Sequence, residues 1–277
     1  MIKADICIIG AGSGGLSLAA GAAQMGARVV LIEGAEMGGD CLNAGCIPSK
    51  ALLAAAKAAQ GMRGGGPFGI TPVEPEIDFS AVKDHVAGVI AKIAPHDSQE
   101  RFEGLGVTVI RAWACFVDAQ TVEAGGQTIR ARRFVIATGS QAAIPPIPGI
   151  EDVDYLTNET IFGLRQKPDH LLVLGGGPIG MEMAQAHLRL GCKVTVIEGF
   201  KALGRDDPET AAVVLDAVRA EGVDIREGQG VARLRKLGDQ IEAVLADGRN
   251  ITGSHLLIAA GRKVALDRLN LTAAGVE

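Results

Sequence analysis

The amino-acid sequence predicts an α/β protein with two Rossmann-like dinucleotide-binding domains, and three observations lead to this fold class. A glycine-rich turn follows a short apolar run twice, at 10–15 (GAGSGG) and at 175–180 (GGGPIG). Each turn opens a helical stretch, and a second apolar run then ends in an acid, Glu33 or Glu198. The spacing from first glycine to acid is the same in both copies. A lone GxGxxG is weak evidence, but two copies in matched strand–helix–strand frames are strong.

Further short patterns complete the first half. Buried-strand runs at Asp5–Ile9 and Arg28–Ile32 flank a small-residue helix that extends to about Gly26. The region 78–102 is mostly helical in pattern and is broken near Pro95. Additional strands are expected at 107–110, 111–117, 128–134 and 134–139. These patterns predict a parallel sheet plus a small antiparallel β element.

The second half repeats this order. Strands are expected at 171–174 and 193–197 around a helix that extends to about Gly191, then at 231–237, 240–245 and 256–261, with a turn at Asp247-Gly248. The proline-rich stretch 144–149 is the natural linker. We therefore expect one domain at 1–150 and a second at 151–270.

Composition excludes several classes of partner. The chain has 277 residues, a formal net charge of −5 and no lysine run, so we expect neither nucleic acid nor an anionic membrane surface as a partner. No apolar run reaches the ~18 residues of a membrane span. The N-terminal residues lead directly into a strand, without the pattern of a signal peptide. Five cysteines are an odd, low count for a secreted scaffold, which favours a cytoplasmic protein.

Cys41 and Cys46 form the most informative pair in the sequence. They follow Gly38-Gly39, and they precede Pro48, which suits a first helical turn because it lacks an N–H. Cys46 would then lie at a helix N-terminus, which favours a thiolate. The pair could be a redox disulfide, two unrelated buried thiols or part of a metal site. A metal site needs more ligands than this segment offers, so we expect no metal and favour the redox disulfide.

The segment GGDCLNAGCIPSK at 38–50 resembles the redox motif of the class I flavoprotein disulfide reductases, the pyridine nucleotide-disulfide oxidoreductases. Within this family it is closest to the branch of dihydrolipoamide dehydrogenase and mercuric reductase. The resemblance implies that FAD binds the first glycine loop. It also implies that Cys46 lies near the flavin and that Cys41 exchanges with the substrate. The expected FAD-contacting residues are Gly10, Gly12, Gly14, Gly15, Glu33, Gly39, Lys50, Ala137, Thr138 and Gly139.

The second loop is expected to bind NAD. Gly175, Gly177 and Gly180 would let the pyrophosphate approach, and Gly261 is a further cofactor-binding candidate. Glu198 would bond the ribose 2′-hydroxyl and repel a 2′-phosphate. NADP stays possible because Lys201 and Arg205 follow closely.

Lys50 and Glu182 are a long-range pair by resemblance alone. In the family the lysine lies beside the flavin and bonds the glutamate of the nicotinamide domain. Without the resemblance, both would be interpreted as ordinary solvated helix residues.

The resemblance implies an FAD-dependent oxidoreductase that passes electrons between NAD(P)H, FAD and the Cys41–Cys46 disulfide. Dihydrolipoamide is the leading substrate, and mercuric ion or another disulfide or metal is the alternative. A non-catalytic, nucleotide-binding redox sensor is the alternative from another class. The implied partners are a small-molecule disulfide or dithiol and, in the full-length protein, a second subunit of a homodimer.

The sequence departs from the family in two places. Pro178 stands where the family often has a tyrosine that covers the flavin. The family also continues after the equivalent of Gly261 with a return to the FAD domain and an interface domain that carries a His-Glu pair. We expect residues 271–277 to begin that return, the interface domain to be absent, and residues 1–277 alone to be inactive.

Overall fold

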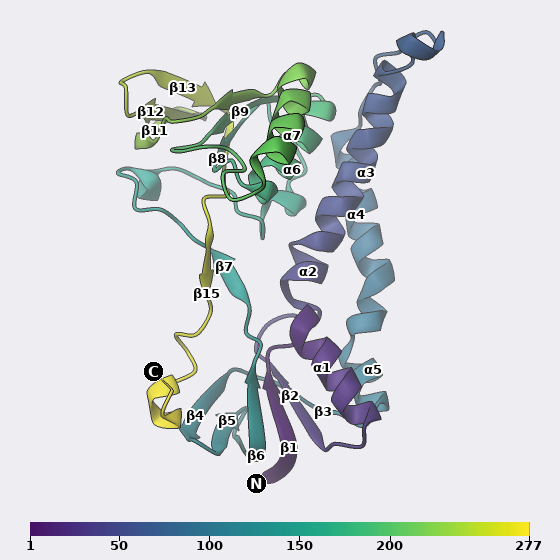
Figure 1. Cartoon of the computed structure of the whole chain (residues 1–277), viewed down its shortest axis with the longest axis vertical. Coiled ribbons are helices and arrows are strands. Elements are labelled where there is room, and N and C mark those ends of the chain that lie inside the picture. The colour runs from purple at the N-terminus through teal and green to yellow at the C-terminus, as the bar shows by residue number, and fades with distance from the viewer. Residues whose placement is uncertain (277) are drawn as a thin grey trace. The chain divides into compact units, whose positions relative to one another are not determined.

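The computed structural model describes residues 1–276, which form two compact units (Figure 1). The first unit contains residues 1–47, 88–141 and the segment from Lys263 onward; the second contains 48–87 and 142–262. We expected a single boundary at 150, but residues 48–87 belong to the second unit and the segment from Lys263 onward belongs to the first. Residues 48–87 pack with the second unit through Lys83, which bonds the Ile161 carbonyl. The last segment adds Leu269 to the core of the first unit.

A mixed sheet forms the first unit, with strand order β3-β2-β1-β6-β5-β4. The strands β1, β2, β3 and β6 are parallel, and the β4–β5 hairpin continues the sheet antiparallel to β6. Every residue of β2 is buried, as expected for a parallel strand that is covered on both faces. The bounds are β1 (Ile2–Ile9), β2 (Val29–Glu33), β3 (Thr108–Arg111), β4 (Ala114–Asp118), β5 (Thr121–Ala124) and β6 (Gln127–Ile136).

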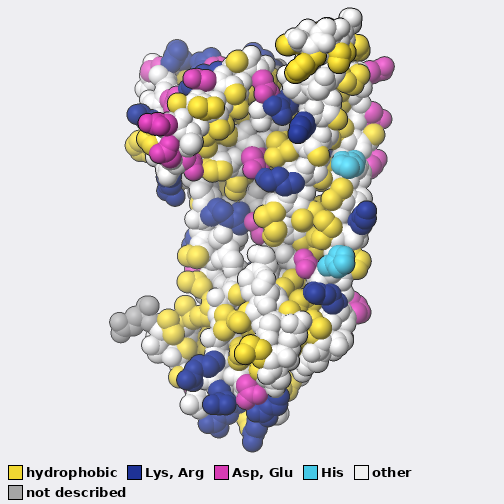
Figure 2. Space-filling view, turned by 45° about the vertical axis from the view of Figure 1, so that its right-hand side comes forward, with side chains coloured by type: hydrophobic (Ala, Val, Ile, Leu, Met, Phe, Trp, Pro, Cys, Tyr) yellow, Lys and Arg dark blue, Asp and Glu magenta, His cyan; other side chains and the backbone are white. Residues whose placement is uncertain are grey.

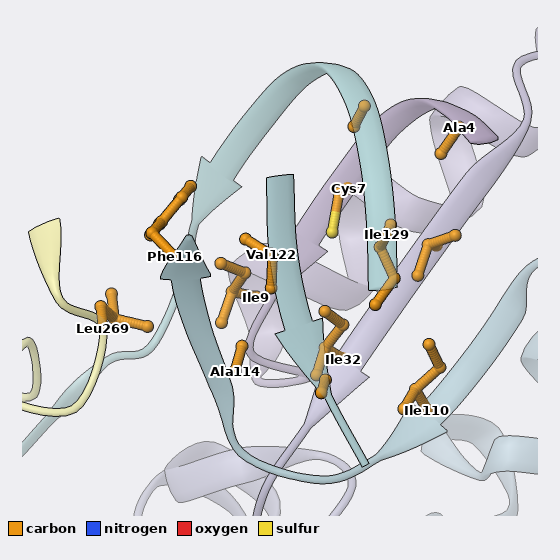
Figure 3. Packing of buried hydrophobic residues seen from close by; sticks show 13 residues of the cluster. Ala4, Cys7, Ile9, Ile32, Ile110, Ala114, Phe116, Val122, Ile129 and Leu269 are labelled. Carbon is orange, nitrogen blue, oxygen red and sulfur yellow. The ribbon is translucent and has the colours of Figure 1, made fainter. Parts of the chain in front are cut away.

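The core of the first unit lies on both sides of this sheet. On one side, Phe116 and Leu269 pack with residues of β1, β2 and β6 (Figure 3). On the other, Leu16 and Ala19 of α1 pack on Ile8 and its neighbours. The small side chains of α1 let the helix lie close to the strands, as the alanine-rich sequence predicts. The helices that begin in this unit are α1 (Ser13–Gln24), α2 (Gly39–Asn43), α3 (Cys46–Arg63) and α5 (Gln99–Gly104).

The second unit contains a parallel sheet, β10-β9-β8-β14, and a separate antiparallel sheet, β11-β12-β13. Its strands are β8 (His170–Leu174), β9 (Lys193–Ile197), β10 (Asp224–Arg226), β11 (Val231–Leu237), β12 (Gln240–Leu245), β13 (Asn250–Gly253) and β14 (His255–Ile258). Its helices are α6 (Pro178–Arg189) and α7 (Pro208–Glu221), with α4 (Phe79–Ile93) beginning in this unit. The short strands β7 (Ser140–Ala142) and β15 (Arg262–Val264) pair where the chain passes between units.

The two halves are structural repeats, as predicted. In the first, Ile9 pairs with Ile32, and in the second, Leu174 pairs with Ile197 at the same offset in residue number. The strand orders β3-β2-β1-β6 and β10-β9-β8-β14 are equivalent. The predicted fold class is therefore confirmed: each half has a parallel sheet plus an antiparallel element.

The closing strands differ from their predicted bounds. The segments expected at 128–134 and 134–139 are one strand, β6, whose residues 127–130 pair with β5 and whose residues 129–136 pair with β1. In the second half the equivalent strand is interrupted at Ser254, which separates β13 from β14. This break allows the antiparallel strands of the second unit to form their own sheet. The strands β5, β10 and β13 were not predicted, because each is short and partly polar.

A group of cations gathers at the end of the first unit that carries the N-terminus (Figure 2). The segment 130–133 of β6 contains three arginines (RARR), and the parallel pairing of β1 with β6 places Lys3 beside Arg130. Arg28 of the same unit is neutralised by Asp5, which accepts from both Nε and Nη2 at 3.1 Å.

Candidate functional site

The first glycine loop contains two kinds of glycine. Gly10 has φ 109°, and a Cβ there would lie 2.3 Å from the carbonyl oxygen of Ala137. A Cβ on Gly15 would lie 1.8 Å from the carbonyl oxygen of Gly10. These two glycines are required by the close packing of β1, α1 and β6. At Gly12, by contrast, a Cβ would meet only Gly39 Cα at 3.9 Å.

Open space therefore lies over Gly12, directly before α1 begins at Ser13. Gly14 borders the same region, and a Cβ there would meet nothing within 4 Å. Helix N-termini present unpaired N–H groups and positive potential, which suit a pyrophosphate. The loop can accommodate a pyrophosphate because no side chain covers its backbone at Gly12 and Gly14.

Glu33 fixes the shape of the first loop. Its Oε2 accepts a hydrogen bond from the Ala11 N–H at 2.6 Å, and its Oε1 accepts from the Ala35 N–H at 2.7 Å. The side chain is buried. A carboxylate offers further acceptor positions, so a ribose contact is compatible with both bonds.

The second loop repeats this arrangement. A Cβ on Gly175 would lie 2.4 Å from the Ala259 carbonyl oxygen, and one on Gly180 would lie 2.0 Å from the Gly175 carbonyl oxygen. A Cβ on Gly177 would meet nothing within 4 Å. Glu198 accepts from the Gly176 N–H at 2.8 Å and from the Phe200 N–H at 2.9 Å. Both predicted dinucleotide loops are thus built from the same contacts.

A cavity of about 760 Å³ lies over the second loop. Gly175, Gly177 and Glu198 line it, together with Gly261 and Pro178, which is the first residue of α6. The cations Lys201, Arg205 and Arg262 also line it. Two acids, Glu198 and Asp206, complete the lining. A concave site with a glycine-rich floor, these acids and several cations can hold a dinucleotide with its phosphates.

The thiol segment packs against the first loop within the first unit. The Gly38 N–H donates to the Ala11 carbonyl at 2.9 Å, and a Cβ on Gly39 would lie 2.6 Å from Gly12 Cα. Asn43 Nδ2 donates to the Met37 carbonyl at 3.0 Å and to the Gly39 carbonyl at 2.9 Å. These contacts hold α2, which carries Cys41, at the edge of the glycine loop.

Both motif cysteines are present as thiols in this structure, with no disulfide between them. Cys41 lies in α2 and is half-buried, whereas Cys46 is exposed at the first position of α3. Burial, and then hydrogen bonding with Cys46, raise the pKa of Cys41 to about 11. Cys41 therefore keeps its proton at neutral pH in the dithiol form.

Lys50 and Glu182 meet in the second unit. Lys50 Nζ lies 2.7 Å from Glu182 Oε1, although 132 residues separate the two in sequence. The contact is present as the family resemblance implied. Both side chains are partly exposed, so the pair itself contributes little to stability.

Ala137, Thr138 and Gly139 follow the end of β6, beside the first loop. The Ala137 N–H donates to the Ile9 carbonyl at 2.8 Å, which sets this turn next to Gly10. Gly139 has φ 68°, and its carbonyl accepts from the Ala265 N–H at 3.1 Å.

The structure also contains features that the sequence did not predict. Phe200 is exposed beside the second loop and lines the cavity. Trp113 covers Gly34 beside the first loop. The repeat places a glycine after each strand-ending glutamate, Gly34 and Gly199, but it gives no signal for either aromatic side chain. Across residues 1–276, no cluster of three or more potential metal ligands was found, and no helix is long and apolar enough to span a membrane.

Residues 4–277 match the family described as pyridine nucleotide-disulphide oxidoreductase. Mercuric reductase of Streptomyces lividans is 37% identical over 282 residues, which cover 99% of this chain and 60% of the relative. Dihydrolipoyl dehydrogenase of Thermus scotoductus is 36% identical over 282 residues, with the same coverage of 99% and 60%. The chain thus spans about three fifths of the length of these relatives.

Solved structures of a flavoprotein disulfide reductase are also similar to this chain. The HOCl-induced flavoprotein disulfide reductase RclA from Escherichia coli superimposes with a TM-score of 0.85 at 30% identity, covering 99% of this chain and 60% of that one. Its Cu(II) complex also gives a TM-score of 0.85 at 30% identity, covering 98% and 60%.

Proposed function

Because the chain belongs to the pyridine nucleotide-disulphide oxidoreductase family, we propose that it passes electrons between NAD(P)H, FAD and the Cys41–Cys46 pair. The family uses FAD and NAD(P)H. One observation carries the proposal for this chain: the segment with both thiols packs directly on the first glycine loop, with Gly39 against Gly12. A thiol pair beside a dinucleotide loop is suited to two-electron exchange.

We assign FAD to the first loop and the pyridine nucleotide to the second. Support comes from the bare backbone at Gly12 and Gly177, where a Cβ would fill the space that a pyrophosphate needs. Four other glycines contribute to cofactor binding only indirectly, because they allow the strand, loop and helix to pack closely: Gly10, Gly15, Gly175 and Gly180. When bound, FAD would supply two-electron transfer between the nicotinamide and a disulfide.

The thiols carry the exchange with the substrate. A thiolate attacks one sulfur of a disulfide to give a mixed disulfide, and the second thiol resolves it. We assign the attacking role to Cys41 and the flavin-side role to Cys46. Cys41 needs to lose a proton that burial and Cys46 help it to retain, so a base is required. We assign to Lys50, which is hydrogen-bonded to Glu182, the role of placing a positive charge beside the flavin.

We propose NAD as the preferred nucleotide, because Glu198 opposes a 2′-phosphate. Lys201 and Arg205 line the same cavity and keep NADP as the alternative.

Dihydrolipoamide is our first candidate for the thiol substrate, and the similarity to a dihydrolipoyl dehydrogenase supports it. Mercuric ion is the second candidate, because two adjacent thiols are soft ligands and mercuric reductases are among the relatives. We propose that the full-length protein acts in the cytoplasm as a homodimer on such small molecules.

Turnover assays on the full-length protein test the proposal. Lipoamide-dependent oxidation of NADH identifies the first candidate, and NADH oxidation that depends on mercuric ion identifies the second. Cys41→Ser and Cys46→Ser should each abolish turnover, whereas Cys115→Ser, which changes an exposed cysteine outside the motif, should not. A flavin-loaded protein whose thiols titrate reversibly without any turnover would instead be a redox sensor.

A further inference from the structure

Arg63, the last residue of α3, connects this helix to the far end of α6 within the second unit. Its Nη1 donates to the Arg189 carbonyl at 2.8 Å. Its Nε donates to Glu74 Oε2 at 2.8 Å, and its Nη2 donates to Oε1 of the same carboxylate. Hydrogen bonds to an ionised group are stronger than those between neutral groups. The Arg63 side chain is only 22% exposed, so its contacts are largely shielded from water.

The end of α6 is a fixed point for this connection. Arg189 is the last residue of α6, and its own guanidinium donates twice to Glu221 of α7, at 2.7 and 2.6 Å. Gln185 donates to the same carboxylate at 2.9 Å. The last carbonyls of a helix have no partner within the helix and carry partial negative charge. The cation of Arg63 therefore suits the Arg189 carbonyl.

The segment after α3 keeps Glu74 within reach of Arg63. The Val73 N–H donates to the Met62 carbonyl at 2.9 Å, which closes the intervening loop at its base. Hydrogen bonding with Arg63 lowers the pKa of Glu74, so the carboxylate stays ionised at neutral pH. Glu74 thus orients the guanidinium from the side opposite to α6.

The same two helices also meet near their first turns, through Lys50 and Glu182. Each residue lies one turn after the start of its helix, at Cys46 in α3 and Pro178 in α6. The side chains of Lys50 and Glu182 are 62% and 38% exposed. Exposed ion pairs contribute little to stability. This pair by itself is therefore too weak to hold α3 in place on α6.

Packing adds few large side chains to this arrangement. The buried apolar residues of α3 other than Pro48 are three alanines and one leucine, Ala51, Leu52, Ala56 and Ala59. Alanines form shallow ridges, so they interlock less with a neighbouring helix than larger side chains do. Lys50 and Arg63 are about 20 Å apart along α3 at 1.5 Å per residue. Polar contacts at two such distant points prevent α3 from pivoting about either one.

We propose that Arg63 is a positioning residue for the contact between Lys50 and Glu182. It ties the end of α3 to the end of α6, and so keeps the ammonium of Lys50 at the Glu182 carboxylate. The consequence for electron transfer, a charge held beside the flavin, rests on the proposed function. The effect of Arg63 on the contact itself is independent of any cofactor.

A carbodiimide cross-link on the full-length protein reports the contact directly. The reagent joins a carboxylate to an amine only where the two groups touch, and Lys50 and Glu182 are both exposed enough to react. Mass spectrometry of the cross-linked peptides measures the Lys50–Glu182 product. Lys236 and Asp154, 3.2 Å apart and exposed in the same unit, provide an internal standard.

Arg63→Met should lower the Lys50–Glu182 product about threefold or more relative to the standard, because the loss of a hydrogen bond from a charged group shifts an equilibrium about tenfold. Arg63→Lys should restore most of the product, since an ammonium can still donate to the Arg189 carbonyl. Arg165→Met, which removes another partly exposed arginine of the second unit, should leave the product unchanged.

The outcomes separate this inference from the proposed function. An unchanged product in Arg63→Met would overturn the inference and leave the proposed function standing. Loss of the product together with the internal standard would also overturn it, because Arg63 would then support the unit as a whole. Selective loss of the product in a protein that binds no flavin would support the inference while the proposed function fails. Should Arg63→Met not fold, Arg63→Gln replaces it, since the shorter side chain loses both the charge and the reach.

Discussion

Glu198 holds the second glycine loop through Gly176, whose N–H donates to its Oε2 at 2.8 Å. Glu33 makes the equivalent bond with the Ala11 N–H at 2.6 Å in the other unit. Each acid ends a parallel strand and ties the neighbouring loop to it. Both acids therefore shape a loop before a ribose is bound, and their substitution should affect the loop as well as ligand discrimination.

Glu198→Gln should weaken NADH binding tenfold or more. The amide keeps the size of the side chain, but its NH₂ cannot accept a hydrogen bond, so either the Gly176 or the Phe200 N–H loses its partner. Hydrogen bonds to charged groups contribute about 1.5–3 kcal/mol. The preference for NADH over NADPH should also narrow, because the negative charge is lost. Titration of nucleotide fluorescence measures both effects.

Glu33→Gln is the matched control in the other unit. It should weaken FAD retention and leave NADH affinity unchanged. Equal loss of NADH binding in both variants would show that the two loops are not independent sites.

Gly12→Ala should reduce flavin retention without unfolding the chain. The added Cβ has no close neighbour apart from Gly39 Cα at 3.9 Å, so it projects into the space assigned to the pyrophosphate. Gly21→Ala, the same change in the middle of α1 and in open space, should retain flavin fully. The flavin-to-protein absorbance ratio after gel filtration gives the answer, and normal flavin content in Gly12→Ala would remove Gly12 from the site.

Cys46→Ala should lower the pKa of Cys41. Burial and hydrogen bonding with Cys46 both raise that pKa, to about 11 in the dithiol form. Removing the second sulfur removes one cause and leaves burial, so the pKa should fall but stay above its ordinary value. The pH dependence of Cys41 alkylation, followed by peptide mass spectrometry, measures this. Cys115→Ala should leave the profile unchanged, and an unchanged profile in Cys46→Ala would mean that the thiols do not interact.

The sequence predicted what local pattern and repetition determine. Gly10 and Gly175 could be identified because a strand, a turn and a helix have a recognisable sequence pattern. The second copy of this pattern made the identification of the loops specific. The meeting of Lys50 and Glu182 followed only from family resemblance, because no local signal brings together residues that lie 132 positions apart.

Tertiary packing determined the rest. Trp113 lies in an irregular segment between two strands, where periodicity says nothing about what a side chain covers. The grouping of residues 48–87 with the second unit was missed for a similar reason. One of its contacts is made by the buried Lys83, and a lysine in a helical pattern is normally expected on the solvent side.

Lys83 should make the stability of the protein depend on pH. Burial lowers its pKa to about 8, from an ordinary value of 10.5. Its partners are the Ile161 carbonyl, 3.0 Å from Nζ, and the Phe79 ring, whose centroid is 5.0 Å away. The buried neighbours His187 and Cys192 bring no compensating negative charge: burial lowers the pKa of His187 to about 3 and raises that of Cys192 to about 12.

The sign of the effect follows from proton binding. Between pH 8 and 10.5 the unfolded chain holds the lysine proton and the folded chain has released it, so the free energy of unfolding should rise with pH. At about 1.4 kcal/mol per pKa unit, the rise is roughly 3 kcal/mol. Lys83→Met should remove this rise, whereas Lys92→Met, which changes an exposed lysine on the same helix, should retain it. Urea unfolding at pH 7 and pH 10 measures the difference between the variants. A wild-type pH dependence that Lys83→Met leaves intact would mean that Lys83 is solvated, and that the docking of residues 48–87 on the second unit does not bury it.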